Sequence, residues 1–182
     1  MTVCFTGHRP EKISGWAHSP EVVEQTIRRA VAEEIVRQSG LGAEEFISGM
    51  APGFDLWAAD EVVRLRSEGV ISPTTKLTLA IPYPHFERSF DSQHHPLYNH
   101  LVECADEVLF VSPHYHKGCY AMRNDLLAER ADTLVAYYEG TEGGTRYTLR
   151  RGQRLGRKSV NLHQGDLFDF RKKVVPLLAN TR

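Results

Sequence analysis

Short β-type runs alternate with segments of helical apolar spacing along the whole chain. Residues 20–39 show the helical pattern, with Val23, Ile27, Val31 and Ile35 on one stripe. Strand patterns fall at residues 2–6, 45–48, 76–81, 107–111, 132–138 and 158–162. Helical patterns fall at residues 20–39, 55–68, 97–105, 119–131, 145–155 and 166–178. Such alternation is typical of βαβ units. It predicts one doubly wound α/β domain over residues 1–182, with a mostly parallel sheet of about six strands and helices on both faces.

The composition indicates which cellular environment and which classes of partner to expect. The chain has 182 residues, 22 basic and 23 acidic, so there is no overall positive field to attract nucleic acid. Cys4, Cys104 and Cys119 are too scattered for a disulfide framework and fit reduced thiols. No apolar run approaches the ~18 residues that span a membrane, and the first residues read as a strand, not as a signal peptide. We therefore expect a cytoplasmic protein with no membrane partner, and nucleic acid is an unlikely partner.

The unusual residues follow the predicted strands. Ligands bind at the carboxyl ends of strands in sheets of this kind. Glycines and polar side chains collect there, whereas the loops at the opposite edge are plain, so we predict one ligand site at this edge. Its predicted ligand-binding residues are Gly7, His8, Arg9, Ser48, Gly49, Met50, Ala51, Gly53, Asp55, Arg123, Asn124, Gly143, Gly144 and Thr145.

Two strand-to-helix turns have alternative interpretations. Gly143-Gly144-Thr145 opens a predicted helix, where free N–H groups favour anions, or it is a turn with a threonine N-cap. Asp55 is either the N-cap of the helix at 55–68, a ligand of a ribose hydroxyl or a general base. Trp57 in the same helix either packs in the core or stacks on a base.

Charged residues and residues of metal-binding type also have alternative interpretations. Arg9 and Arg123 lie at the ligand edge, where guanidinium groups match phosphate oxygens. His8 is either a ligand contact or a loop histidine. His114, His116 and Cys119 lack the convergent pattern of a zinc site, so we expect no metal and no cofactor. Residues 83–96, aromatic and rich in histidine, are expected to form a long loop or short helices.

The basic run at residues 150–158 also has two interpretations. It contains Arg150, Arg151 and Arg154 within a predicted helix. The run is either a solvated helix face or a contact for nucleic acid.

Five motifs in order carry a family resemblance. They are "CFTGHRP", "SGMAPGFDLWAADEV", "IPYP", "AMRNDLL" and "EGGTRYTLR". Together they resemble the YpsA-like family of the SLOG superfamily of Rossmann-like proteins, which includes the Lonely Guy phosphoribohydrolases and the DNA-processing protein DprA. The resemblance implies a Rossmann-like fold and a site for a nucleotide or nucleotide sugar. It assigns Ser48 to Asp55, Arg123 and the turn at 143–145 to that site.

One departure bears on catalysis. Lonely Guy enzymes carry a Pro-Gly-Gly-x-Gly-Thr-x-x-Glu motif with a catalytic glutamate, and Thr148 stands at that position here. Threonine cannot act as an acid or base at neutral pH, so Asp55 and Glu139 are the candidate catalytic residues.

Three functions follow from these observations. The first is a sensor or regulatory protein that binds a nucleotide or an ADP-ribose-like ligand. The second is a nucleotide hydrolase that cleaves an N-glycosidic or phosphoester bond. The third is DprA-like binding of single-stranded DNA. Whether the chain is an enzyme, and whether it forms a homo-oligomer, stays open.

Overall fold

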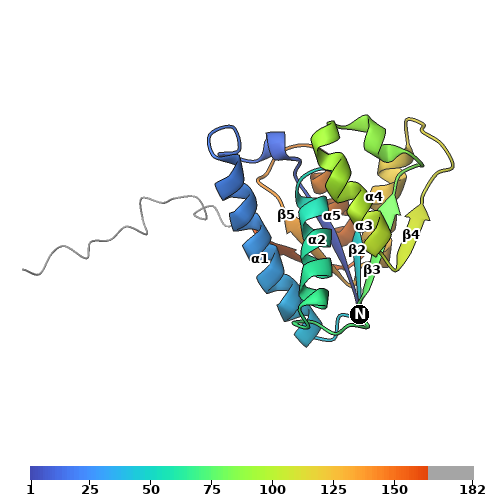
Figure 1. Ribbon diagram of the computed structural model, residues 1–182. Helices are drawn as coiled ribbons and strands as arrows, with labels where there is room; N and C mark the ends of the chain where they lie inside the picture. The colour runs from blue at the N-terminus through green and yellow to red at the C-terminus, as the bar shows by residue number, and fades with distance from the viewer. Residues whose placement is uncertain (164–182) are drawn as a thin grey trace, which may run out of the picture.

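The computed structural model describes residues 1–163 and contains one six-stranded sheet (Figure 1). The strands are β1 (Thr2–Gly7), β2 (Glu45–Ser48), β3 (Lys76–Ile81), β4 (Glu107–Phe110), β5 (Thr133–Tyr137) and β6 (Lys158–Asn161). Their order is β4-β3-β2-β1-β5-β6, and every neighbouring pair is parallel. The predicted fold class is therefore confirmed, with a fully parallel sheet.

Within the described residues, five α-helices cover the two faces of the sheet. They are α1 (Pro20–Gly40), α2 (Phe54–Ser67), α3 (His95–Cys104), α4 (Cys119–Arg130) and α5 (Gly144–Arg154). Helix α2 packs on β1 to β3 and lies between α1 and α3, whereas α4 and α5 pack together and against β1. Helices therefore cover both faces, as predicted. None of the helices within residues 1–163 has the length and hydropathy needed to cross a bilayer. The helix predicted at 166–178 lies outside the described residues.

The alternation of side chains along β1 separates two cores. Phe5 belongs to the larger core, where its ring stacks on Phe46 with 5.6 Å between ring centroids. Cys4 points to the opposite face and joins the smaller core, which includes Leu134. Helix α5 approaches that face closely, because a Cβ on Gly152 would overlap the side chain of Leu134. Both faces of the central strands are thus buried, which explains their continuous apolar runs.

The strand at 107–111 and the aromatic segment at 83–96 add detail that the sequence patterns did not provide. The apolar run at 107–111 is typical of a strand that is covered on both faces, but β4 is an edge strand and Phe110 is 53% exposed. An apolar run alone does not distinguish an edge strand from a central one. The aromatic segment at 83–96 forms two 3₁₀ turns, η2 (Phe86–Ser89) and η3 (Ser92–His94), as one of the two alternatives proposed.

The strand order places a crevice at one position. The chain adds β2, β3 and β4 successively to one side of β1 and then returns to add β5 and β6 to the other side. The connections therefore diverge between β1 and β5, whose register pairs Gly7 with Tyr137 at their carboxyl ends. Doubly wound proteins bind ligands at such a switch point.

Candidate functional site

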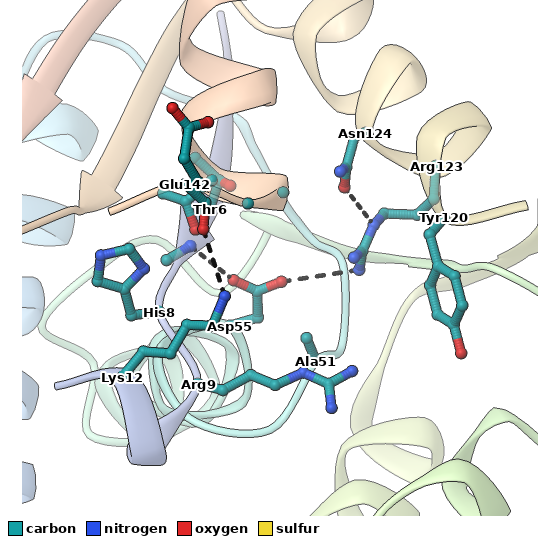
Figure 2. A pocket seen from close by; sticks show the side chains of 14 residues that line it. Thr6, His8, Arg9, Lys12, Ala51, Asp55, Tyr120, Arg123, Asn124 and Glu142 are labelled. Carbon is teal, nitrogen blue, oxygen red and sulfur yellow. Dashed lines mark hydrogen bonds and ion pairs between the residues drawn. The ribbon is translucent and has the colours of Figure 1, made fainter. Parts of the chain in front are cut away.

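A cavity of about 210 Å³ lies at this switch point (Figure 2). Its walls come from the end of β1, the 3₁₀ turn η1 (Pro10–Lys12), the turn before α2, and the first turns of α4 and α5. The lining residues are Thr6, Gly7, His8, Arg9, Lys12, Ala51, Asp55, Tyr120, Arg123, Asn124, Glu142, Gly143, Gly144 and Thr145.

Most of the predicted site residues line this cavity. The structure brings together Gly7, His8, Arg9, Ala51, Asp55, Arg123, Asn124, Gly143, Gly144 and Thr145. Five predicted residues do not line it: Ser48, Gly49, Met50, Gly53 and Glu139. Most of these five residues shape the walls of the cavity.

The turn after β2 shapes the wall through its backbone. Ser48 is fully buried, and its Oγ donates to the carbonyl of Asp55 at 2.8 Å and accepts from Met50 N at 3.2 Å. Met50 is fully buried with φ 59°, a left-handed conformation that is uncommon outside glycine. Gly53 has φ 89°, and a Cβ there would lie 2.7 Å from the carbonyl oxygen of His8. The turn is therefore pressed against the segment that follows β1.

A buried carboxyl group, that of Asp55, and a buried guanidinium group, that of Arg123, face each other in the cavity. Asp55 Oδ1 accepts a hydrogen bond from Gly7 N at 3.0 Å, and Oδ2 lies 3.7 Å from Arg123 Nη1. Arg123 also donates through Nη1 to the carbonyl of Gly49 and through Nε to Asn124 Oδ1 at 2.9 Å. A Cβ on Gly49 would overlap the Arg123 guanidinium, so glycine is required there. The side chains of α2 and α4 thus meet across the carboxyl edge of the sheet (Figure 2).

Burial perturbs both members of this pair. It raises the pKa of Asp55 to about 6, and Arg123 together with the N–H groups of Gly7 and Ala51 opposes the rise. Burial likewise lowers the pKa of Arg123, and the nearby charge of Arg9 acts in the same direction. Asp55 is not the N-cap of α2: Gly53 holds that position, and Asp55 lies in the first helical turn with its side chain directed to β1. Asp55 is therefore placed to titrate inside the cavity.

The first turn of α5 presents its backbone to the cavity. Gly143 is the N-cap with φ 144°, and no side chain caps the helix. Thr145 is not the N-cap that one interpretation expected, and Thr148 donates from Oγ1 to the carbonyl of Gly144 at 2.9 Å. Gly144 also allows close packing, because a Cβ there would lie 3.1 Å from Asn124 Nδ2. Free N–H groups and the helix dipole favour an anion at this position.

His8 joins the two strands that flank the cavity. Its ring Nε2 accepts a hydrogen bond from the backbone N–H of Glu139 at 3.0 Å and lies 3.3 Å from Thr141 Oγ1. Burial is the main cause that lowers the pKa of His8, so the neutral ring is favoured. An acceptor Nε2 also places the remaining ring proton on Nδ1. His8 therefore holds the loop after β5 in place and borders the cavity at the same time.

Glu139 is directed away from the cavity. Its carboxylate accepts hydrogen bonds from Ser14 N at 3.1 Å, from Ser14 Oγ at 2.5 Å and from Tyr137 Oη at 3.2 Å. These contacts tie the segment after η1 to the end of β5. Its predicted role as an acid or base gains no support from this position.

Four lining residues were not among the predicted site residues: Thr6, Lys12, Tyr120 and Glu142. Lys12 donates through Nζ to the carbonyl of Glu142 at 3.3 Å, across the rim between η1 and α5. Tyr120 lies one helical turn before Arg123 on α4. The spacing of three residues between Tyr120 and Arg123 was a signal that could have placed Tyr120 on the same helix face. No signal of this kind pointed to Lys12 and Glu142, which a tertiary contact brings together.

Other candidates have structural roles. Trp57 is 3% exposed and stacks on Trp16 with 5.5 Å between ring centroids, so it is a core residue. Within residues 1–163, no three His, Cys, Asp or Glu side chains are grouped to hold a metal ion. In the basic run at residues 150–158, Arg151 lies 2.8 Å from Glu129 and 3.3 Å from Asp125. The charge of Arg151 is therefore paired at the protein surface.

Known proteins resemble the chain in sequence and in fold. A UPF0398 protein of Halalkalibacterium halodurans is 23% identical over 145 residues, which cover 79% of this chain and 75% of the relative. A UPF0398 protein of Ligilactobacillus salivarius is 24% identical over 150 residues, which cover 81% and 80%.

The fold also resembles a solved structure of DNA processing protein A from Helicobacter pylori, a protein described for its single-stranded DNA binding mode. The TM-score is 0.56 at 16% identity, and the likeness covers 87% of this chain but 63% of that one, less than two thirds of its length. The model of the YspA SLOG family matches residues 3–166. Because this match spans most of the sequence, the chain belongs to the YspA SLOG family.

Proposed function

We propose that the cavity binds a nucleotide or a nucleotide-derived ligand, such as a nucleotide sugar or an ADP-ribose-like compound, and that the protein acts as a sensor or regulator. One observation carries the proposal. The uncapped first turn of α5 lines the same cavity as the cationic side chains of Arg9, Lys12 and Arg123. Backbone N–H groups and guanidinium groups are both good donors to phosphate oxygens.

The charges around the cavity support an anionic ligand. Three cationic side chains line it, against the carboxyl groups of Asp55 and Glu142. The carboxylate of Glu142 is paired with Arg146, which is not a lining residue, so the three lining cations are opposed chiefly by the carboxyl group of Asp55. The cavity therefore has an excess of positive charge, which a phosphate group would neutralise.

The volume indicates which part of a ligand is enclosed. Sites for drug-sized molecules measure roughly 300–1,000 Å³. A cavity of about 210 Å³ is smaller than this range, so it encloses a phosphate and a sugar, with the remainder of the ligand beyond the rim.

A titration with matched compounds tests the proposal. Ribose 5-phosphate and a panel of nucleotides are expected to bind in calorimetry, and free ribose is not, because the phosphate supplies most of the contacts. A ligand at a hundredfold excess over its Kd also stabilises the fold by about 2.7 kcal/mol. Failure of every phosphate compound to bind would refute the proposal.

A matched pair of lysine variants locates the binding. Lys12→Ala removes a cation from the rim and is expected to weaken ribose 5-phosphate binding by about tenfold or more, the size of one charge-assisted hydrogen bond. Lys158→Ala removes an exposed lysine at the start of β6, at the opposite edge of the sheet, and should leave the Kd unchanged. Equal effects of the two variants would place the ligand elsewhere.

A nucleotide hydrolase is the second candidate function. The observation that favours it is Asp55, a carboxyl group in the cavity with its pKa raised to about 6, close to the value that suits a general acid or base at neutral pH. Chromatography of nucleotides after incubation with the protein tests this function. Turnover that is lost in Asp55→Asn while binding is retained would support it. Equal turnover by the two proteins would exclude Asp55 as the catalytic group.

Binding of single-stranded DNA is the third candidate, favoured by the fold that the chain shares with DNA processing protein A. On α5, the cations Arg150 and Arg154 of the basic run are exposed, and the pairing of Arg151 with Glu129 leaves this surface with less positive charge. Contacts to DNA phosphates would give an affinity that falls steeply with salt. An affinity that does not change with salt, or that Arg150→Ala leaves unaltered, would contradict this function.

A further inference from the structure

A second hollow adjoins the cavity across the side chain of Arg9. It measures about 300 Å³, and Arg9 lines both spaces. Pro10 and Pro52 form part of its wall, and the turn at Gly53 packs directly against Pro10, since a Cβ on Gly53 would lie 2.8 Å from Pro10 Cδ. Figure 2 shows the Arg9 side chain passing Ala51, on the side of the cavity away from Glu142. The two spaces are therefore neighbours, separated by one arginine.

Aromatic side chains that are only partly buried line this second hollow. Trp16 comes from the segment after η1, and Phe90 comes from the segment between η2 and η3. Both rings are held in place by other rings: Trp16 stacks on Trp57, and Phe90 contacts Phe86 with 5.3 Å between ring centroids. Such fixed rings offer a stacking surface at little entropic cost.

The polar groups of the hollow differ from those of the first cavity. Glu11 and Asp91 contribute carboxylates, Gln93 contributes an amide and His94 an imidazole ring. One oxygen of Asp91 already accepts a hydrogen bond from Gln93 N at 3.0 Å. Two carboxylates disfavour a second phosphate, whereas carboxylates and an amide can bind the amino and ring nitrogens of a base. The hollow is therefore suited to a neutral, planar group that carries hydrogen-bond donors.

We propose that this second hollow binds the nucleobase of a nucleotide whose phosphate lies at the first turn of α5. Arg9 then lies between the two parts of the ligand and contacts both. The inference rests on the proposed function and goes beyond it by naming the group that the protein recognises outside the first cavity. It also explains how a cavity of about 210 Å³ serves a ligand larger than itself.

Paired ligands and paired variants test the inference by calorimetry. The probes are AMP, which has a base, and ribose 5-phosphate, which lacks one. Trp16→Ala and Phe90→Ala are each expected to weaken AMP binding at least about 5-fold, the lower end of base–aromatic stacking by alanine substitution, and to leave ribose 5-phosphate binding unchanged. Phe110→Ala removes an exposed aromatic ring from edge strand β4 and should change neither.

Tryptophan fluorescence supplies a second readout that does not depend on the alanine variants. The chain has two tryptophans, so Trp57→Phe leaves Trp16 as the one emitter. AMP is expected to quench its emission and ribose 5-phosphate is not.

The outcomes separate the two proposals. If AMP and ribose 5-phosphate bind the wild type equally, with no quenching by AMP, the inference is overturned and the proposed function stands. If Trp16→Ala and Phe90→Ala weaken both probes to the same extent, the rings support the first cavity and the inference is likewise overturned. If AMP, ribose 5-phosphate and every other phosphate compound of the panel fail to bind, both proposals fail.

Discussion

The charge state of Asp55 makes the stability of the fold depend on pH in an unusual direction. Burial raises the pKa of Asp55 from 3.8 to about 6, because the ionised carboxylate loses its contact with water. Arg123 offsets only part of this rise, since its Nη1 lies 3.7 Å from the carboxylate, too distant for a hydrogen bond. Between these two pKa values the folded protein binds one proton more than the unfolded chain. Its stability must therefore fall as pH rises through this window. A shift of about 2 units corresponds to about 3 kcal/mol.

Asp55→Asn isolates this effect, because asparagine has a similar shape, keeps an acceptor for Gly7 N and does not titrate. Urea unfolding followed by circular dichroism gives the unfolding free energies of both proteins at several pH values. From about pH 4 to pH 7, the wild type is expected to lose about 3 kcal/mol relative to the variant. A difference that grows in favour of the wild type as pH rises would show that the ion pair with Arg123 outweighs burial, and a constant difference would refute the raised pKa.

Two further predictions concern packing and thiol reactivity. Gly49→Ala is expected to cost about 3 kcal/mol or more, because a Cβ displaces the Arg123 guanidinium and disrupts its buried contacts. Gly40→Ala, where a Cβ meets nothing within 4 Å, should be neutral or stabilising in the same urea unfolding assay, and equal losses would contradict the packing argument. Burial raises the pKa of Cys4, so a thiol reagent should modify the half-buried Cys104 first and Cys4 only on unfolding. Modification of Cys4 at the same rate as Cys104 in the native protein would count against its burial.

The architecture could be predicted from sequence because each of its signals is local. The apolar spacing of Val23, Ile27 and Ile35 and the β-rich runs are properties of a few adjacent residues, and alternation of the two patterns predicts a parallel sheet. The position of a strand in the sheet is a different matter. Phe110 lies in a run as apolar as those of the central strands, but β4 has a neighbour on one side only. Edge and centre are properties of the assembled sheet.

For the site, too, the sequence predicted what depends on local patterns and not what depends on tertiary contacts. Knowing that carboxyl ends of parallel strands share an edge was enough to gather most of the lining residues. Sequence alone did not show which side chains point into the cavity. Glu139 comes from the expected loop, but its carboxylate accepts hydrogen bonds from Ser14 and Tyr137 instead of lining the cavity. Lys12 reaches the rim through a contact with a residue far along the chain, and no local pattern reports such a contact.

The pairing of β1 with β5 has a consequence for how the protein folds. Val3 pairs with Phe46 in β2 on one side and with Thr133 in β5 on the other. The pairing with β2 joins residues that are near in sequence, whereas the pairing with β5 joins residues separated by most of the described chain. Closing longer loops costs more entropy, and distant contacts slow folding. We expect the amides of β1 that bond to β5 to gain protection from hydrogen exchange later than those that bond to β2. Simultaneous protection would contradict this order. On a ribosome, the seam that carries the cavity would be completed only after β5 has emerged.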